Sequence, residues 1–321
     1  MRIRYVGVLG GSGFVGTVLV NQLNDAGYKV KVFTRRRESA KHLILLPYVE
    51  VIECDILDDV QLAVALSGCD AVINLVGILH EGRRASFDAL HAELPRRIAD
   101  ICRNEGVRRL LHMSALQASA DAPSAYLRSK AAGEANVLAE TGVPDFTDEL
   151  QVTIFQPSVI FGRGDSFLNM FARLTRWLPI MLLARPQAKF QPIWVDDVAR
   201  AFIASLENPD TYGQRYALCG PRIYTLRELV QYVEDVIGVK RPIIGLNDDF
   251  SYWFAALMEH LPGKLMTRDN LLSMLVDNVC DKGFPSVFRF QPTTLESVVP
   301  DYLSNYRFRN IYNRYRSHSG R

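Results

Sequence analysis

The sequence lacks the features that mark membrane-spanning, strongly charged or repetitive proteins. None of its apolar runs reaches the roughly 20 residues that a helix needs to span a bilayer. The formal net charge is only +2, so we expect no strongly charged partner and no nucleic acid. Internal repeats and low-complexity segments are also absent. What remains is an ordinary globular chain of 321 residues, long enough for one large domain and a smaller lobe.

Cysteine and histidine are scarce, and neither follows a pattern typical of a disulfide framework or a metal site. The cysteines are Cys54, Cys69, Cys102, Cys219 and Cys280, with no C-x-x-C pair. An odd, dispersed set predicts reduced thiols rather than a disulfide framework. The six histidines lack metal-ligand spacing, so no metal is expected. No leader peptide precedes the first predicted strand, which favours the cytoplasm.

What is present begins with a glycine-rich turn between a predicted strand, residues 3–9, and a helix. The turn and the start of that helix read Gly10, Gly11, Ser12, Gly13, Phe14, Val15 and Gly16. This arrangement places a pyrophosphate on the amides at the N-terminus of the helix, so these seven residues are predicted to bind a dinucleotide. The spacing fits both G-x-G-x-x-G and G-x-x-G-x-x-G. The alternative is a tight turn with no ligand.

Basic residues follow the second predicted strand, residues 28–33. In a dinucleotide-binding fold, an acid at the end of this strand accepts the ribose 2′-hydroxyl and selects NAD. Here the position holds Thr34, Arg35 and Arg36, followed by Arg37. Guanidinium groups would hold a 2′-phosphate, so Thr34, Arg35 and Arg36 predict NADP(H), with NAD(H) as the second choice. The alternative is a solvated surface turn.

Two further strand ends are predicted to meet the cofactor. Asp55 and Ile56 follow a third strand, residues 49–54, where Asp55 either reaches the adenine or caps the next helix. A fourth strand, residues 70–76, is nearly all apolar and hence covered on both faces. At its end, Asn74, Val76 and Gly77 bring the backbone close to the cofactor ribose.

Strands and helices alternate through the first half of the chain. A helix over residues 87–104 precedes a fifth strand, residues 107–113. We therefore expect an α/β fold with a doubly wound, mainly parallel Rossmann sheet. The NADP(H)-binding domain is assigned to residues 1–165, with its sheet taking in parts of 185–220. A smaller, mostly helical C-terminal lobe covers residues 166–321.

Three residues form a candidate catalytic group. Ser114 lies at the carboxyl end of the fifth strand, the edge where ligands bind in open α/β sheets. Tyr126 and Lys130 are four apart on one face of a helix. A neighbouring ammonium and an oxidised nicotinamide would lower the pKa of the phenol toward neutrality, so that Tyr126 moves a proton while Ser114 holds the substrate oxygen. A Tyr–Lys pair on a helix surface is otherwise inert.

These motifs, in this order, resemble the extended or atypical short-chain dehydrogenase/reductases. Gly10, Gly13 and Gly16 match the glycine pattern of that family, and Ser114, Tyr126 and Lys130 match its catalytic triad. Residues 155–165 resemble its P-x-x-V-x-G segment and residues 191–199 its V-x-D-V-A element. The resemblance implies that the backbone of Pro157, Ser158 and Val159 meets the nicotinamide amide, and that Tyr126 and Lys130 also contact the cofactor.

A narrower resemblance exists within that superfamily. Residues 126–134, 160–163 and 167–169 are similar to the NAD(P)H-binding Rossmann accessory subunit of respiratory complex I and its bacterial relatives. This resemblance implies tightly bound NADPH, a mainly structural role and a partner in a membrane redox complex.

The C-terminal half gives weaker signals. Amphipathic helices are predicted over residues 167–178, 195–206 and 226–237. Two further helices within 250–279 either pack over the smaller lobe or form a greasy surface for a lipid-like substrate, a membrane or a partner subunit. The last twenty residues interleave arginine with tyrosine and contain no acid, which suits anionic lipid or an acidic partner.

Two functions follow from these patterns. The first is an NADP(H)-dependent oxidoreductase or epimerase acting on a small carbonyl or hydroxyl compound, including a lipid-like molecule or a quinone. The second is a non-catalytic NADPH-binding accessory or assembly factor of a membrane redox complex. For the second, we expect a cytoplasmic protein that lies peripherally at the inner face of the membrane.

Overall fold

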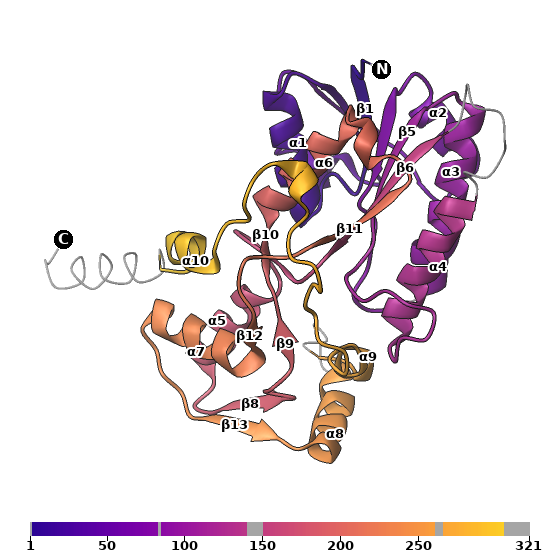
Figure 1. Ribbon diagram of the computed structural model, residues 1–321. Helices are drawn as coiled ribbons and strands as arrows, with labels where there is room; N and C mark the ends of the chain where they lie inside the picture. Colours follow the sequence, from indigo (N-terminus) through magenta and orange to yellow (C-terminus); the bar gives the residue numbers. More distant parts are fainter. Residues whose placement is uncertain (1, 83–84, 140–149, 261–265, 305–321) are drawn as a thin grey trace, which may run out of the picture. The chain divides into compact units, whose positions relative to one another are not determined.

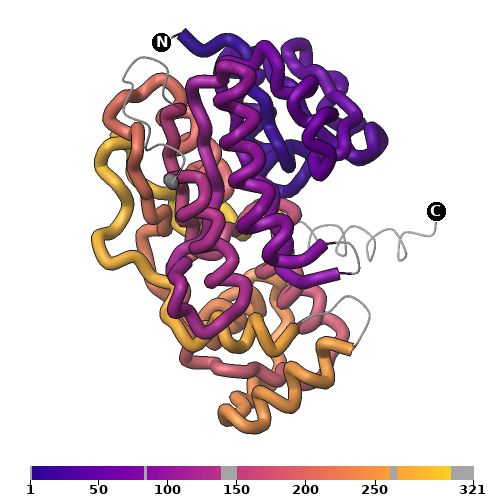
Figure 2. Tube along the Cα trace, turned by 90° about the vertical axis from the view of Figure 1, so that its right-hand side faces the viewer, coloured from indigo at the N-terminus to yellow at the C-terminus, as the bar shows by residue number. Residues whose placement is uncertain are grey.

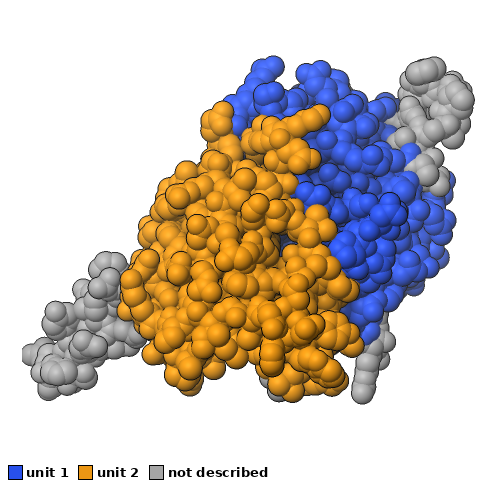
Figure 3. Space-filling model, turned by 60° about the horizontal axis from the view of Figure 1, so that its bottom comes forward, with its two compact units in different colours: residues 1–157, 195–218, 285–290 blue, residues 158–194, 219–284, 291–321 orange. Residues whose placement is uncertain are grey.

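The computed structural model describes residues 2–82, 85–139, 150–260 and 266–304. The chain divides into two units, which Figure 3 colours separately. Unit 1 holds residues 1–157, 195–218 and 285–290, and unit 2 holds the segments between and after them. Unit 1 is therefore discontinuous in sequence, because two later segments return to it.

Unit 1 is built on a seven-stranded sheet whose strand pairs are all parallel. The strand order is β11-β6-β5-β4-β1-β2-β3, so the chain winds outward from β1 in both directions. This confirms the predicted doubly wound α/β fold. The strands are β1 Tyr5–Leu9, β2 Lys29–Thr34, β3 Val49–Glu53, β4 Ala71–Asn74, β5 Arg109–Met113, β6 Gln151–Pro157 and β11 Gln214–Leu218.

Helices cover both faces of this sheet (Figure 1). α1 packs beside α6 on one face, and α2, α3 and α4 cover the other, with α3 and α4 side by side in Figure 2. These helices are α1 Phe14–Asp25, α2 Asp59–Leu66, α3 Leu94–Asn104, α4 Ala125–Ala139 and α6 Val195–Leu206. The central strands are apolar because both of their faces are covered: all of β4 and all but the first residue of β1 are buried.

The helix predicted over residues 87–104 contains an unpredicted irregularity. A π-helical turn, Asp88–Glu93, precedes the regular α3. α4 packs closely against this turn. A Cβ added to Gly133 would lie only 1.9 Å from the carbonyl oxygen of His91, so this close approach requires glycine at position 133. The backbone of His91 therefore lies where this turn meets α4.

A fully buried arginine on β5 ties this strand to β6, to the end of α6 and to the turn that precedes β11. The Arg109 guanidinium on β5 donates to Thr153 Oγ1 (2.7 Å), to the Ser205 carbonyl (2.8 Å) and to Thr211 Oγ1 (3.0 Å). It also lies over the Tyr212 ring, 4.5 Å from its centroid. Burial lowers the pKa of Arg109 to about 10, which leaves it charged at neutral pH.

Unit 2 contains three two-stranded sheets and a set of helices around a core of its own. Leu229, Val230 and Val233 of α7 are fully buried in that core, and Phe171 of α5 lies in the same cluster. The strands are β7 Ile160–Phe161, β8 Met181–Ala184, β9 Lys189–Phe190, β10 Ile193–Trp194, β12 Tyr224–Thr225 and β13 Ile243–Leu246. The helices are α5 Leu168–Trp177, α7 Leu226–Ile237, α8 Asp248–Glu259, α9 Arg268–Ser273 and α10 Leu295–Leu303.

The structure corrects the prediction that all five cysteines are reduced. Cys219 and Cys280 form a disulfide within unit 2, with their Cα atoms 6.2 Å apart. Cys54, Cys69 and Cys102 are free and buried. Sequence spacing could not reveal the pair, because 61 positions separate its members and only the tertiary fold brings them together.

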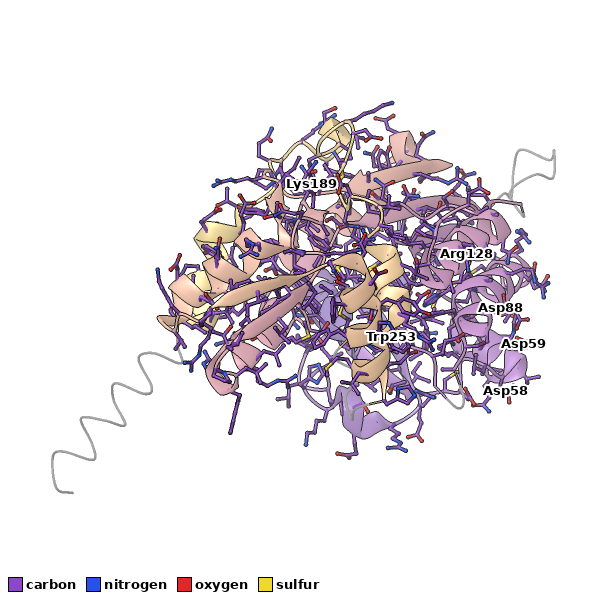
Figure 4. All side chains as sticks on the ribbon, turned by 90° about the horizontal axis from the view of Figure 1, so that it is seen from below. Asp58, Asp59, Asp88, Arg128, Lys189 and Trp253 are labelled. Carbon is purple, nitrogen blue, oxygen red and sulfur yellow. A yellow bond between two sulfur atoms is a disulfide. The ribbon has the colours of Figure 1, made fainter. Side chains whose placement is uncertain are left out.

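The helix α8 does not bury its apolar stripe. Phe250, Trp253 and Leu257 lie three and four positions apart on one face of α8 and are 67%, 74% and 63% exposed. Trp253 is labelled in Figure 4. The prediction of two packed helices therefore holds in part: Ser251 and Ala255 of α8 and Leu271 of α9 are buried, whereas the apolar stripe of α8 is exposed.

Two further predictions concern the membrane and the C-terminal end. Within the described residues, no helix combines the length and the apolar composition needed to cross a bilayer. Most of the basic C-terminal stretch, residues 305–321, lies outside the described residues.

Candidate functional site

The glycine turn joins β1 to α1 as predicted. Gly10 is required by its backbone conformation, and Gly16 is required because a side chain there would collide with the turn. Gly10 has φ +79°, a conformation that L side chains rarely adopt. A Cβ on Gly16 would lie 2.2 Å from the Gly10 carbonyl oxygen, so α1 can pack on the turn only without one. Gly13 is the N-cap of α1, and among the described residues no side chain caps this helix. The helix N-terminus thus fits a diphosphate, which its free amides and dipole would bind.

The basic residues after β2 are exposed. Thr34 itself is buried, and its hydroxyl donates to the Arg36 carbonyl (3.1 Å) and lies 3.3 Å from the Arg36 amide nitrogen. Arg35, Arg36 and Arg37 are exposed, and within the described part of the chain their side chains have no partner. Thr34 therefore fixes the backbone of a turn whose guanidinium groups remain available to an anion.

Asp55 and Asn74 both brace the backbone that follows their strands. Asp55 Oδ1 accepts from the Leu57 amide (3.1 Å), whereas Asp58 is the residue that caps α2. Asp58 and Asp59 are labelled at this helix in Figure 4. Asn74 is buried, and its Oδ1 accepts from the Val76 amide (3.0 Å), which shapes the turn through Val76 and Gly77.

The three candidate catalytic residues all lie in unit 1. Ser114 follows β5 directly and is buried, with its amide donating to the Phe155 carbonyl of β6 (2.7 Å). Tyr126 and Lys130 lie on the first turns of α4, which begins where Ser124 Oγ accepts from the Leu127 amide (3.2 Å). Lys130 is 2% exposed, and its Nζ donates to the Met113 carbonyl at the end of β5 (3.2 Å). This bond brings the helix residue to the strand end that carries Ser114.

Lys130 also lies close to the turn after β4. A Cβ added to Gly77 would lie 3.2 Å from Lys130 Nζ, so a side chain at position 77 would crowd the ammonium group. The predicted ribose-binding turn and the predicted catalytic lysine are therefore neighbours in the structure.

Burial dominates the electrostatics of the site. The predicted lowering of the Tyr126 pKa requires Lys130 together with an oxidised nicotinamide, whereas burial by the protein alone raises the pKa of this phenol to about 12. Burial also lowers the pKa of Lys130 to about 8, against the opposing attraction of Glu134. Desolvation is the larger effect on both groups, with Lys130 buried and Tyr126 half-buried. At neutral pH the phenol is protonated, as an unperturbed phenol also is, and it can donate a proton.

Two buried residues that the sequence analysis missed contact this group. His91 lies edge-on to Tyr126, with 5.5 Å between the ring centroids, and stacks on Phe87. Glu134, one turn beyond Lys130, accepts from Gln156 Nε2 (2.7 Å) and pairs with Arg215 Nε (3.2 Å). Burial raises the pKa of Glu134. A polar residue within an otherwise apolar helix face, such as His91 beside Leu90 and Leu94, was the available signal in the sequence.

The last predicted cofactor residues span the boundary between the units. Pro157 ends β6 in unit 1, where its carbonyl accepts from the Leu116 amide (2.9 Å). Ser158 and Val159 begin unit 2, and their hydroxyl and amide both donate to Asn278 Oδ1, at 2.5 and 3.0 Å. Sequence analysis did not single out Asn278, which comes from a segment 119 residues away.

A parallel sheet with a glycine turn at the start of α1, and polar side chains at its carboxyl edge, defines a dinucleotide-binding Rossmann unit. The model of the NAD dependent epimerase/dehydratase family matches residues 6–219. The chain belongs to this family and is an NAD(P)-binding protein of the short-chain dehydrogenase/reductase type.

Individual relatives fall into two groups. The chain is 36% identical over 310 residues to "NADH dehydrogenase [ubiquinone] 1 alpha subcomplex subunit 9, mitochondrial" of Rattus norvegicus, a match that covers 94% of this chain and 80% of the rat protein. It is 26% identical over 342 residues to "3 beta-hydroxysteroid dehydrogenase/Delta 5-->4-isomerase" of Mycobacterium tuberculosis, covering 92% and 90% of the two chains. The first group confirms the resemblance to the accessory-subunit family drawn from the sequence.

Solved structures support the fold. The structure of MoeE5 in complex with UDP-glucuronic acid and NAD has a TM-score of 0.71 at 18% identity, covering 95% of this chain and 99% of that one. UDP-glucuronic acid 4-epimerase from Bacillus cereus, in complex with UDP-glucuronic acid and NAD, has a TM-score of 0.69 at 16% identity, covering 94% and 99%. At these identities the likeness establishes the shared fold.

Proposed function

We propose that this protein is an NADP(H)-dependent reductase in which Tyr126 donates a proton to the carbonyl oxygen of a small substrate. The observation that carries this proposal is the geometry of Tyr126 and Lys130. The two residues share one face of α4, and the buried Lys130 donates to the Met113 carbonyl at the strand end that carries Ser114. A protonated phenol suits the reduction of a carbonyl, because the developing alkoxide needs a proton.

Each of the other residues has a separate task in this proposal. Ser114 holds the substrate oxygen, and Lys130 places a positive charge beside the phenol as negative charge develops on it. A bound nicotinamide supplies the hydride. Tyr126 then gives its proton to the reduced oxygen, and the resulting phenolate is stabilised by Lys130 until solvent returns a proton. The same proton transfer, reversed, serves an epimerase.

The proposed cofactor contacts follow the strand ends. Gly10, Gly11, Ser12, Gly13, Phe14, Val15 and Gly16 bind the diphosphate at the N-terminus of α1, and Asp55 and Ile56 border the adenine. Asn74, Val76 and Gly77 border the nicotinamide ribose, as do Tyr126 and Lys130, and the backbone of Pro157, Ser158 and Val159 faces the nicotinamide amide. The exposed Arg35 and Arg36 support a preference for NADP(H).

A second function is favoured by the relatives and by the surface of unit 2. The rat relative is named as a subunit of NADH dehydrogenase, and a relative in Neurospora crassa is named "NADH-ubiquinone oxidoreductase 40 kDa subunit, mitochondrial". The apolar stripe of Phe250, Trp253 and Leu257 is exposed and suits a partner protein or a membrane surface. In this alternative the protein holds NADPH as an accessory or assembly factor of a membrane redox complex, peripherally at the cytoplasmic face.

One experiment separates the two functions. The full chain is purified without added nucleotide, and any bound nucleotide is identified by mass spectrometry after denaturation. The protein is then mixed with isotope-labelled NADPH, and exchange and oxidation are followed while carbonyl compounds or short-chain quinones are added.

The reductase is supported by NADPH that exchanges within minutes and is oxidised in the presence of a carbonyl or a quinone. The accessory role is supported by NADPH that neither exchanges nor reacts. A protein that binds neither NADPH nor NADH contradicts both.

A further inference from the structure

A segment near the C-terminal end of unit 2, residues 276–280, returns to the residues that follow β6. We call it the return segment. Its central residue, Asn278, accepts the Ser158 hydroxyl (2.5 Å) and the Val159 amide (3.0 Å) at the same Oδ1 atom. The Asn278 backbone completes the contact, since its amide donates to the Lys189 carbonyl and its carbonyl accepts from the Gln191 amide, at 2.9 and 3.0 Å. One side chain thus fixes the position of two consecutive residues, 158 and 159.

A second residue, Gln191, holds the return segment from the other side. Gln191 Oε1 accepts from the Cys280 amide (3.0 Å), while its Nε2 donates to the Gly220 carbonyl (2.7 Å). Gln191 is 7% exposed, so both bonds form in a buried environment where unmade bonds are costly. Lys189, labelled in Figure 4, adds an exposed ion pair with Asp277 (3.4 Å).

The disulfide is the covalent part of this contact. Cys219 directly precedes Gly220, and Cys280 lies two residues after Asn278. The Cys219–Cys280 bond therefore joins the two ends of the hydrogen-bonded path that runs from Gly220 through Gln191 to the return segment. Hydrogen bonds alone hold the segment when this bond is broken.

The three free cysteines are poorly suited to thiol–disulfide exchange. Burial raises the pKa of Cys54 and raises that of Cys69 to about 11, and Cys102 is fully buried, so the free cysteines are poor nucleophiles. Within the disulfide, Cys219 is 0% exposed and Cys280 is 8% exposed, so Cys280, which directly precedes the exposed residues 281–283, is the sulfur that an attacking thiolate reaches when this end of the segment opens.

We propose that Cys219–Cys280 is a reversible redox site whose reduction by a dithiol protein releases the return segment and, through Asn278, loosens residues 158–159. A thiolate of the dithiol attacks one sulfur, the Cys219–Cys280 bond breaks, and the released thiolate takes a proton. The second thiol of the dithiol then resolves the mixed disulfide. Two electrons and two protons pass from the dithiol to the pair, and the dithiol becomes a disulfide. A small disulfide such as oxidised glutathione reverses the reaction.

The consequence for ligand binding rests on the proposed function, in which residues 157–159 face the nicotinamide amide. Loosening Ser158 and Val159 removes a preorganised wall of that site, and a less preorganised site releases its ligand faster. The oxidised protein is then the form that retains NADPH, and the reduced protein is the form that exchanges it.

The first test counts thiols in the full chain. Protein purified without reductant is incubated with oxidised glutathione, denatured and alkylated with iodoacetamide, and its intact mass is measured. We expect three alkylated cysteines before reduction and five after reduction with dithiothreitol. Five alkylated cysteines in both samples overturn the proposal, because the pair then does not form a disulfide.

The second test follows the return segment by hydrogen–deuterium exchange, without any nucleotide. Amides of residues 276–284 and 158–160 are expected to exchange at least tenfold faster after dithiothreitol treatment and in Cys280→Ser. Cys102→Ala is the matched control and should respond to dithiothreitol as the unchanged protein does. Equal exchange in oxidised and reduced protein overturns the proposal.

The third test measures NADPH release by nucleotide fluorescence. Reduction is expected to raise the dissociation rate by at least fivefold, and Asn278→Ala by a similar factor in the oxidised protein. Asn278→Asp, which keeps an acceptor oxygen, should remain within twofold of the unchanged chain. An unchanged dissociation rate on reduction overturns the link to the cofactor. If NADPH does not bind at all, the proposed function fails, whereas the exchange experiment still decides whether the redox site exists.

Discussion

His91 joins the turn after β4 to the helix that carries Tyr126. Its Nε2 accepts from the Ile78 amide (3.0 Å), and its Nδ1 lies 2.9 Å from Ser129 Oγ. Because the Ser129 hydroxyl donates to the Tyr126 carbonyl (2.8 Å), it has only a lone pair left for His91. The hydrogen-bond pattern therefore assigns the imidazole proton to Nδ1. Burial, reinforced by Lys130, lowers the pKa of His91 to about 3, so the ring stays neutral.

His91→Phe keeps an aromatic ring against Tyr126 and Phe87 but leaves the Ile78 amide without its acceptor. An unsatisfied buried donor costs about 1–3 kcal/mol, so thermal unfolding should occur several degrees lower. Any reductase activity should fall by more than NADPH affinity does, because the lost bonds to Ile78 and Ser129 hold the helix that carries Tyr126. His91→Gln offers an acceptor on a flexible chain, so its thermal unfolding temperature should lie between those of the parent and His91→Phe. A His91→Phe protein as stable as the parent would contradict this account.

Tyr126→Phe removes one oxygen atom and leaves the ring packing on Phe87 and His91 in place. We expect turnover to fall at least 100-fold, because general acid catalysis by one positioned group contributes about 10²–10⁴-fold. NADPH affinity, measured by fluorescence titration, should stay within a few-fold. Activity equal to that of the parent would exclude Tyr126 as the proton donor.

Lys130 predicts a pH dependence of stability. Its pKa is about 8 in the folded protein, below the ordinary 10.5, so the unfolded chain binds more protons than the folded one between these values. The contribution of Lys130 to the free energy of unfolding therefore rises as the pH increases from about 8 to 10.5. At pH 7 its buried charge is destabilising by up to about 3 kcal/mol.

Lys130→Met should accordingly raise the free energy of unfolding at pH 7 by about 1–3 kcal/mol while abolishing activity. Urea denaturation between pH 7 and 10 is the measurement, and the variant should lack the rise seen in the parent. A variant that is less stable at pH 7 would show that the Met113 hydrogen bond outweighs the cost of burying the charge.

The cofactor preference is tested at the end of β2. Replacing both Arg35 and Arg36 by alanine should weaken NADPH at least several-fold more than NADH, since a charged hydrogen bond contributes about 1.5–3 kcal/mol. Arg37→Ala is the control, because Arg37 already begins the next 3₁₀ turn, Arg37–Ala40. Equal losses for both nucleotides, measured by titration calorimetry, would remove the assignment to the 2′-phosphate.

Local patterns in the sequence were sufficient for much of unit 1. The turn at Gly10 to Gly16 could be predicted because strand periodicity, glycine spacing and helix periodicity lie within one short stretch. The helix predicted over residues 226–237 was found unchanged as α7, since Thr225 and Glu228 form a capping box at its start and Gly238 ends it.

Long-range features could not be predicted in this way. The Asn278 contact and the Cys219–Cys280 bond join residues 119 and 61 positions apart, and nothing in the local sequence marks them. The π-helical turn before α3 packs against α4, and the pKa of Tyr126 is raised by burial where α4 meets Phe87 and His91. The four-residue spacing predicts that Tyr126 and Lys130 are neighbours on one helix face, but it does not predict that burial removes both groups from water.

The buried guanidinium on β5 limits how this protein can be shortened. Two of the acceptors around Arg109 belong to residues 205 and 211, which the chain reaches only after passing through part of unit 2. A fragment ending at residue 157 would contain the complete glycine turn and all three candidate catalytic residues. The Arg109 guanidinium in such a fragment would lack two of the hydrogen-bond acceptors that offset the free-energy cost of burying its charge. The smallest autonomous piece able to bind a nucleotide is therefore larger than the first continuous stretch of sequence that carries the motifs.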